Sequence, residues 1–522
     1  MQKWPDMPED ALYTRVTYAE MLVSALNRYP ERPALVFEDR RLSYRDLAAS
    51  ISQVCQALTG LGLQRGACLA QLSTNRPEAV VVQFASYVLG LRYVPLHPLG
   101  AADDHAYILN DAGAAAFIYE EGRFAEVAPR IAAEAPELLH VLSHAELDGL
   151  AKVCEQKPLV PSAAPDGIVA QLYTGGTSGR SKGVKLSNRA MVMNVFLTLS
   201  EWEWPGEIRF LCATPITHAT GCMLIPILLR GGSVVLHSAF DVDAFLHDVP
   251  AHRITATFLV PTMIYLLLER QRTAKADLSS LETIIYGGAP ISPARLAEAV
   301  AVFGPVFMQI YSQSEAPNCA TVLRRHEHVG ADLQRLSSCG RPMAGITVRL
   351  LDEQSRPVAT GEVGEICFRG PSIMNGYWQR PGETAETLRD GWLHTGDMAY
   401  QDSGGFIFIV DRRKDMVVSG GFNVFPREIE DVLTAHPAVA AAAVIGVPDE
   451  KWGEAVKAIV VLRPDAAVDS GALIAHVRAR KGPVAAPKSI DFVDSIPVTA
   501  LGKPDKKVLR AQYWKGQSRQ VH

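Results

Sequence analysis

The sequence predicts an α/β protein in which a large, mostly parallel sheet unit is followed by smaller units that contain antiparallel strands. Three observations support this prediction. The chain has 522 residues, and single hydrophobic cores stop growing at roughly 250–300 residues, so several domains are expected. Strand and helix signals alternate up to about residue 310, which is typical of helices covering a mostly parallel sheet. Beyond about residue 335, strand signals follow one another across Gly and Pro turns.

Local signals predict the elements in chain order. Ser43 and Asp46 have the spacing of a capping box, and apolar residues continue at helical spacing up to Gly60 and Gly62. Short apolar runs predict strands at 68–72, 93–96, 168–173, 233–236, 257–260, 284–286 and 306–311. Apolar residues at helical spacing predict helices at 262–270 and 293–302. Strands at 346–352, 364–369 and 405–410 indicate a small β subdomain, and the residues from 411 onward mix strands with helices.

The composition excludes several classes of protein. Apolar residues make up 48% of the chain and charged residues 20%, which is ordinary for a globular protein and excludes a disordered chain. Lys and Arg number 51 against 56 Asp and Glu, and the net charge of −5 disfavours a nucleic-acid-binding protein. The eight cysteines are scattered without a CxxC pair, which favours a reducing compartment over a zinc site or a disulfide framework.

The sequence also argues against export and membrane insertion. The N-terminal segment MQKWPDMPEDALYTR is polar and lacks the apolar core of a signal peptide. The longest uncharged stretch, 210–229, contains Pro215, Pro226 and a polar Thr-His cluster, so strand, loop and buried helix are expected there rather than a membrane span. We therefore expect a cytoplasmic protein with no transmembrane segment.

The densest chemical signal is the string YTGGTSGRSKGV at 173–184, between a predicted strand and a helix that opens near Ser187. Its glycines allow the backbone to approach an anion closely, its hydroxyls are hydrogen-bond donors, and Lys182 supplies a positive charge. This composition predicts a polyphosphate-binding loop. It is not a Walker A loop, because the lysine precedes its glycine. A plain Gly/Ser surface loop is the alternative, as is the nucleophile region of an amidase-signature hydrolase, whose upstream lysine and serine pair are not in position.

Six further strings follow in the same order as in a known family. They are ATPITH at 213–218, YGGAP at 286–290, QIYSQSE at 309–315, WLHTGD at 392–397, DRRKD at 411–415 with its continuation to 430, and PVTALGK at 497–503. With these strings the sequence resembles the adenylate-forming superfamily of acyl-CoA synthetases, including 4-coumarate-CoA ligase-like enzymes, luciferases and peptide-synthetase adenylation domains. The loop departs from the family pattern [ST]SGTTGxPKG at Gly175, Ser178 and Ser181.

The resemblance implies a domain organisation. Residues 1–410 would form an AMP-binding domain of two αβαβα-type subdomains plus a small β-barrel subdomain. Residues 411–415 would form a hinge centred on Lys414. Residues 416–522 would form a small mobile α+β lid domain.

The resemblance also implies a nucleotide site. Lys503, Glu315 and Lys182 would be catalytic, and Glu315 would hold Mg²⁺, since a hard cation prefers carboxylate oxygens. Tyr311 would stack on adenine, and Asp397 would accept hydrogen bonds from the ribose hydroxyls. The full set implied for ATP or AMP is Thr174, Gly175, Gly176, Thr177, Ser178, Gly179, Lys182, Gly288, Ala289, Gln309, Tyr311, Ser314, Asp397, Arg412 and Lys503.

The remaining implied residues bind the acid and the thiol. The acyl-pocket set is His218, Thr220, Met223, Tyr286, Gly288, Ala289, Ile310 and Pro317. Coenzyme A would pass Gly420, Gly421 and Phe422.

The expected activity is an ATP-dependent acid–CoA ligase that uses ATP, Mg²⁺ and coenzyme A. It would form acyl-AMP with release of pyrophosphate and then transfer the acyl group to coenzyme A. Two alternatives are an adenylating enzyme that loads a carrier-protein thiol and an amidase-type hydrolase. The sequence does not choose between fatty and aryl acids, and it leaves open whether the chain forms a homodimer.

Overall fold

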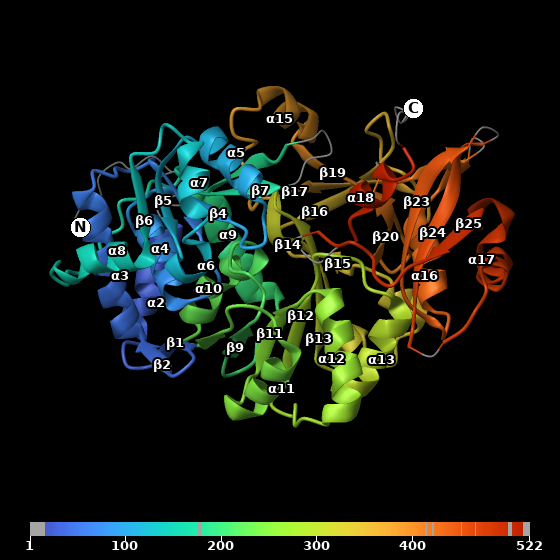
Figure 1. Cartoon of the computed structure of the whole chain (residues 1–522), viewed down its shortest axis with the longest axis horizontal. Coiled ribbons are helices and arrows are strands. Elements are labelled where there is room, and N and C mark those ends of the chain that lie inside the picture. The colour runs from blue at the N-terminus through green and yellow to red at the C-terminus, as the bar shows by residue number, and fades with distance from the viewer. Residues whose placement is uncertain are drawn as a thin grey trace, which may run out of the picture.

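The computed structural model describes residues 16–174, 180–412, 415–419, 422–449, 452–464, 466–499 and 504–514. It confirms the predicted α/β class, with a large N-terminal part and a smaller C-terminal part that lies to one side of it (Figure 1). The described residues form four sheets: two mostly parallel sheets and one antiparallel sheet in the large part, and one sheet in the C-terminal part. Among the described residues, no helix combines the length and apolar character that a bilayer span requires.

The larger of the two parallel sheets has nine strands. Its order is β15 (Arg341–Pro342), β14 (Ala316–Leu323), β13 (Phe307–Gln313), β12 (Thr283–Tyr286), β11 (Ala256–Leu259), β9 (Arg209–Cys212), β10 (Ser233–Leu236), β1 (Pro33–Phe37) and β2 (Arg40–Ser43). The pairings from β13 to β1 are parallel, and β14, β15 and β2 are antiparallel at the edges. The interior strands are buried, as expected for a sheet covered on both faces.

The second sheet has six strands. Its order is β6 (His140–Ser143), β5 (Ala114–Tyr119), β3 (Cys68–Leu72), β4 (Arg92–Leu96), β7 (Ile168–Thr174) and β8 (Lys182–Ser187). Only the last pairing, β7 with β8, is antiparallel. The strand predicted at 68–72 is confirmed, because β3 begins and ends at these residues.

Helices fill the space between these sheets and cover their outer faces. The central core joins residues of both sheets with α2 (Tyr18–Arg28), α3 (Tyr44–Gly60), α4 (Pro77–Val88), α8 (His144–Lys152), α9 (Asn188–Glu201) and α10 (Ala219–Leu229). One outer core contains α5 (Ala102–Ala112), α6 (Glu121–Phe124) and α7 (Ala128–Ala133). The other contains α11 (Val242–Ala251), α12 (Pro261–Ala274), α13 (Pro293–Phe303) and α14 (Leu333–Leu336). The layers therefore run α, β, α, β, α.

Local predictions can be checked at two helix starts. The capping box before α3 is present, with the Asp46 amide donating to Ser43 Oγ over 3.1 Å and the Ser43 amide donating to Asp46 Oδ2 over 2.9 Å. Ser187 caps α9, as expected, by accepting from the Ala190 amide. The sequence did not reveal strand β8 between the phosphate loop and α9, because Lys, Gly and Ser give it a weak strand signal.

The predicted small β subdomain is a five-stranded antiparallel sheet. Its order is β16 (Thr347–Leu351), β17 (Gly364–Arg369), β19 (Trp392–Gln401) and β18 (Leu388–Arg389), with β20 (Ile407–Arg412) also paired to β19. The pairings among the described residues form an open path rather than a closed ring. The short helix α15 (Pro381–Thr387) precedes β18.

The C-terminal part has its own sheet and core. The strands are β21 (Val417–Ser419), β22 (Phe422–Val424), β23 (Val439–Asp449), β24 (Gly453–Leu462) and β25 (Ser489–Phe492). The helices are α16 (Pro426–Thr434), α17 (Ser470–Ala485) and α18 (Lys506–Ala511). The α+β composition predicted for this region is confirmed, while the predicted boundaries at 410 and 415 stay predictions.

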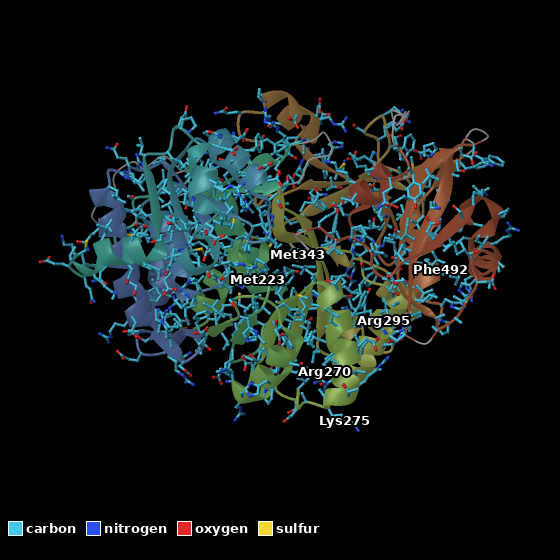
Figure 2. All side chains as sticks on the ribbon, viewed as in Figure 1. Met223, Arg270, Lys275, Arg295, Met343 and Phe492 are labelled. Carbon is cyan, nitrogen blue, oxygen red and sulfur yellow. The ribbon has the colours of Figure 1, made fainter. Side chains whose placement is uncertain are left out.

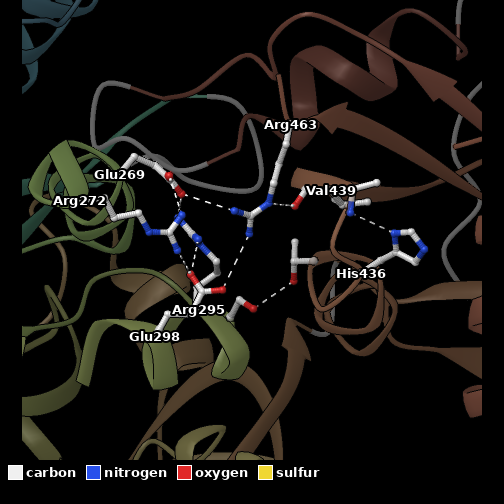
Figure 3. Close-up of polar contacts among 10 residues, drawn as sticks. Glu269, Arg272, Arg295, Glu298, His436, Val439 and Arg463 are labelled. Carbon is white, nitrogen blue, oxygen red and sulfur yellow. Dashed lines mark hydrogen bonds and ion pairs between the residues drawn. The ribbon is translucent and has the colours of Figure 1, made fainter. Parts of the chain in front are cut away.

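Polar contacts join the two parts directly, including a hydrogen bond between Thr434 and Ser292 and a group of ion pairs (Figure 3). Glu269 and Glu298, on α12 and α13, pair with Arg295 at 2.6 and 2.5 Å and with Arg272 at 3.0 and 3.1 Å. From the C-terminal part, Arg463 adds its guanidinium to the same carboxylates, 3.5 Å from Glu269 and 4.0 Å from Glu298. We call these five residues the inter-domain ion cluster. Its two contacts to Arg463 require the C-terminal part to have this orientation relative to α12 and α13.

Candidate active site

Predicted site residues from several elements gather around the carboxyl ends of β12 and β13. Glu315 lies in the turn between β13 and β14, and Gly288 follows β12. Asp397 lies on β19 and Lys182 begins β8. These residues come from three different sheets, so their convergence is a property of the tertiary fold. Ligands of open α/β sheets bind at such strand ends.

Asp397 is buried and its carboxylate is held in a fixed orientation. Tyr311 Oη donates to Asp397 Oδ2 over 2.5 Å, and Gln313 Nε2 donates to the same oxygen over 2.9 Å. Burial raises the pKa of Tyr311, and the Asp397 carboxylate raises it further, so the hydroxyl remains the donor. A rigid carboxylate at this place suits recognition of a pair of hydroxyls.

The segment of β19 just before Asp397 is anchored from β17. Glu365 Oε1 accepts from the Gly396 amide over 2.9 Å, and Glu365 Oε2 lies 2.9 Å from His394 Nδ1. Glu365, Cys367 and His394 could place one ligand atom each around a metal ion, since those atoms lie within 4.8 Å of one another. Arg389 Nη2, however, lies 2.9 Å from the same His394 nitrogen, and its positive charge opposes a cation there. We therefore interpret this cluster as an anchor for this segment of β19.

Glu315 and Lys182 are linked through Tyr377, which sequence reasoning did not find. Tyr377 Oη donates to Glu315 Oε1 over 2.8 Å. Burial, followed by the Glu315 carboxylate, raises the pKa of Tyr377, so its hydroxyl stays protonated. The Lys182 ammonium lies over the Tyr377 ring, 4.9 Å from its centroid, and forms an ion pair with Glu383. The Glu315 carboxylate and the Lys182 ammonium thus both lie next to the Tyr377 side chain.

The backbone of 374–378 fixes Tyr377 between two elements. The Met374 amide donates to the Glu315 carbonyl over 2.8 Å. The Trp378 amide donates to the Gly183 carbonyl over 2.7 Å, and the Lys185 amide donates to the Gly376 carbonyl over 3.0 Å. This segment therefore ties β8 to the β13–β14 turn.

The predicted phosphate loop is braced on both sides. Thr174 pairs with Lys182 in the β7–β8 register, which makes the loop a hairpin connection. Tyr173 Oη donates to Asp111 Oδ2 over 2.7 Å, and Tyr107 Oη donates to the Ser181 carbonyl over 3.1 Å. Both tyrosines thus hold the ends of the hairpin to α5. Gly175, Gly176, Thr177, Ser178 and Gly179 lie outside the described residues.

The predicted adenine-binding strand end is open at its surface. Gly288 is exposed and has a φ of +79°, a conformation that L side chains rarely adopt. A Cβ at Gly287 would meet the Ile310 carbonyl oxygen at 2.5 Å, so only glycine fits between β12 and β13. Ala289 is half-buried, and Ser314 lies in the β13–β14 turn. Gln309 is buried on β13, where its Oε1 accepts a hydrogen bond from Tyr286 Oη.

Of the predicted acyl-pocket residues, His218 has the clearest polar surroundings. Its ring lies edge-to-face with His97, with centroids 5.2 Å apart, and its Nδ1 lies 2.8 Å from Thr217 Oγ1. Burial, followed by the nearby His105, lowers the pKa of His97 to about 4, so His97 is neutral near pH 7. His97 carries no motif that would mark it in the sequence, and the structure places it beside His218.

The other acyl-pocket candidates are buried. Met223, in the middle of the molecule (Figure 2), and Tyr286 are both 0% exposed. Thr220 bonds Thr214 through hydroxyls 2.5 Å apart, and Ile310 and Pro317 are buried on their strands. An acid would reach these side chains only if their neighbours move, so their role stays a prediction.

The remaining predicted site residues lie towards the C-terminus of the chain. Arg412 stands opposite Asp397 in the β19–β20 register, which brings the two residues implied for ribose to neighbouring positions. Phe422 is 60% exposed on β22. Lys414, Gly420, Gly421 and Lys503 lie outside the described residues.

Comparison with known proteins gives consistent matches over nearly the whole chain. The family model "AMP-binding enzyme" matches residues 22–378, and the model "AMP-binding enzyme C-terminal domain" matches residues 428–503. The chain is 47% identical over 521 residues to the medium/long-chain-fatty-acid–CoA ligase FadD8 of Mycobacterium tuberculosis, covering 96% of this chain and 91% of that protein. It is 39% identical over 488 residues to feruloyl-CoA synthase of Amycolatopsis sp, covering 93% and 96%. The solved structure of the amide bond synthetase McbA from Marinactinospora thermotolerans matches with a TM-score of 0.87 at 34% identity, covering 95% of this chain and 99% of that one.

Proposed function

Because the chain belongs to the AMP-binding enzyme family, we propose that it is an ATP-dependent acid–CoA ligase with a fatty acid as its main substrate. It is an AMP-forming ligase that activates a carboxylic acid as acyl-AMP and transfers the acyl group to coenzyme A. The observation that carries the site assignment is the convergence of Asp397, Glu315 and Lys182 from separate sheets.

The chemistry requires phosphate charge to be neutralised. A carboxylate is a poor electrophile, and joining it to AMP supplies a good leaving group. Lys182 and Lys503 are the cations assigned to the phosphates, and Asp397, held by Tyr311 and Gln313, is assigned to the ribose hydroxyls. Positioning and electrostatic stabilisation supply most of the rate in such transfers.

Glu315 fits the magnesium role proposed for it. It offers a half-buried carboxylate at a turn, beside the hairpin assigned to the phosphates. Mg²⁺ in nucleotide enzymes is commonly bound by one or two carboxylates together with substrate phosphates. When bound, the ion would neutralise part of the phosphate charge. Tyr377 donates to one oxygen of Glu315 and thereby orients the carboxylate.

The proposed second half-reaction uses the C-terminal part as a mobile lid. Lys414 is the proposed hinge residue, and the segment of Gly420, Gly421 and Phe422 is assigned to the pantetheine arm. Hinge motions of this kind depend on a few residues that absorb the change in φ and ψ. The acceptor thiol would enter on the side of His218, whose ring packs on His97.

The substrate assignment rests on the 47% identical relative, whose name specifies medium- and long-chain fatty acids, and a panel of acids tests it. The panel comprises straight-chain fatty acids of graded length and hydroxycinnamic acids such as ferulate, each with ATP, Mg²⁺ and coenzyme A. We expect AMP release and a thioester of the matching mass for the fatty acids. Thioesters formed from the aryl acids alone would overturn the substrate assignment. Acyl transfer to an amine or a carrier protein, but not to coenzyme A, would overturn the ligase assignment.

The inter-domain ion cluster predicts a specific effect on the two half-reactions. Arg463→Ala removes the guanidinium that reaches Glu269 and Glu298, which disfavours the orientation that this structure has. Partly exposed ion pairs contribute about 0.2–1 kcal/mol, so we expect changes of up to about five-fold. Because the enzyme alternates between orientations, one half-reaction slows and the other accelerates. Pyrophosphate exchange and thioesterification of added acyl-adenylate measure them separately.

Lys481→Ala is the matched control, because Lys481 pairs with Glu428 inside the C-terminal part at 3.2 Å. We expect this variant to leave the ratio of the two rates unchanged. If Arg463→Ala slowed both half-reactions equally, the cluster would have only a structural role.

A further inference from the structure

The Lys182 ammonium is already engaged by an anionic side chain of the protein. It forms an ion pair with Glu383 Oε2 while lying over the Tyr377 ring. The Lys182 side chain is 18% exposed and that of Glu383 is 33% exposed, so the pair is partly shielded from water. Glu383 lies on α15, about 200 residues after Lys182, and it belongs to none of the sequence motifs described above.

Glu383 is held in place from its own side of the contact. Arg380 Nε lies 3.8 Å from Glu383 Oε1, and Pro381 starts α15. Thr384 Oγ1 donates to the Arg380 carbonyl over 2.7 Å and accepts from the Tyr377 amide over 3.0 Å. The helix is therefore fixed against the residue that contacts Lys182, and Glu383 faces Lys182 because of this packing.

An ammonium group cannot give its full interaction to a carboxylate and to a phosphate at the same time. If Lys182 binds the phosphates of ATP, the Glu383 carboxylate competes with them for the same charge. When pyrophosphate leaves, Glu383 can pair with the ammonium again, which lowers the cost of separating the lysine from the departing anion.

We propose that Glu383 is a positioning residue that takes the place of the phosphate anion on Lys182 in the nucleotide-free enzyme. It keeps the ammonium directed at the phosphate site, weakens the binding of ATP and pyrophosphate, and promotes pyrophosphate release. This inference rests on the proposed role of Lys182 as a phosphate ligand.

Glu383→Gln tests the proposal because it keeps the size of the side chain and removes the charge. We expect the KM for ATP and the inhibition constant of pyrophosphate each to fall by about two- to five-fold, the range that a partly exposed ion pair supports. The KM for the acid stays unchanged. Calorimetric titration with ATP and with pyrophosphate gives the same affinities without turnover. Glu386→Gln, on the exposed side of the same helix, is the control and changes neither constant.

The outcomes separate this proposal from the proposed function. If Lys182→Met raises the KM for ATP but Glu383→Gln leaves it unchanged or raises it, the role of Glu383 is wrong and that of Lys182 stands. If Lys182→Met alters neither ATP binding nor adenylation, the role of Lys182 fails, and this inference fails with it. In the double variant, Glu383→Gln adds no further change in ATP affinity if the proposal is right. A parallel loss of ATP affinity and melting temperature in Glu383→Gln would indicate a purely structural role and overturn the proposal.

Discussion

Lys503→Ala lowers the rate of acyl-adenylate formation by about 100-fold or more but leaves thioesterification of added acyl-adenylate close to normal. The reason is electrostatic: removing one preorganised donor from a site where charge develops typically costs about 100- to 1,000-fold in rate. Lys503 is assigned to the first half-reaction only, because the lid must rotate before the thiol enters. Pyrophosphate exchange measures the first step, and coenzyme A thioester formation from synthetic acyl-AMP measures the second.

Lys507→Ala provides a control for this experiment. Lys507 is an exposed lysine at the start of α18, four residues after Lys503. Its replacement tests whether loss of positive charge from this end of the chain is enough to slow the reaction, and we expect no effect on either step. Equal losses in both half-reactions of Lys503→Ala would contradict the assignment of this lysine to adenylation alone.

The second large effect is expected from Glu315→Gln. This change removes the charge of the carboxylate but keeps a side chain that accepts a hydrogen bond from Tyr377. We expect the maximal rate of adenylation to fall by about 100-fold and the Mg²⁺ concentration for half-maximal activity to rise. A magnesium titration of pyrophosphate exchange measures both quantities.

Tyr377→Phe separates the charge of Glu315 from its orientation. This variant removes the hydroxyl that donates to Glu315 Oε1 over 2.8 Å and keeps the ring beneath Lys182. Because the Glu315 carboxylate keeps its charge in this variant, we expect the rate of adenylation to fall less than in Glu315→Gln. An unaltered magnesium dependence in Glu315→Gln would show that another residue holds the ion.

The sequence predicts best those parts of the proposed site that are encoded in contiguous strings. Asp397 could be found because it ends WLHTGD, and the structure places that string on β19 with the carboxylate held by Tyr311. Glu315 could be found because it follows a buried strand, and it lies in the turn directly after β13. In such strings, the same few residues determine the local backbone conformation and supply the functional side chain.

The partners of these residues could not be predicted, because they are distant in the sequence. Tyr377 meets Glu315 across 62 positions, and the string GYW at 376–378 carries no charge that would mark it as part of a phosphate site. Glu383 resembles any other acidic residue near a helix start. Strand β8 was missed for a different reason, since pairing with β7 rather than local propensity stabilises it.

The register between β19 and β20 places the residues proposed to bind the ribose close to the proposed hinge. Arg412 is the last residue of β20 and stands beside Asp397, and only one residue separates it from the proposed pivot at Lys414. A ribose bound by both residues would restrict the motion of the end of β20, next to the residue about which the lid is proposed to rotate. We therefore expect the proposed hinge to be less mobile with acyl-AMP bound than with the site empty. The adenylate intermediate would then itself define the rotation that brings the thiol into the site.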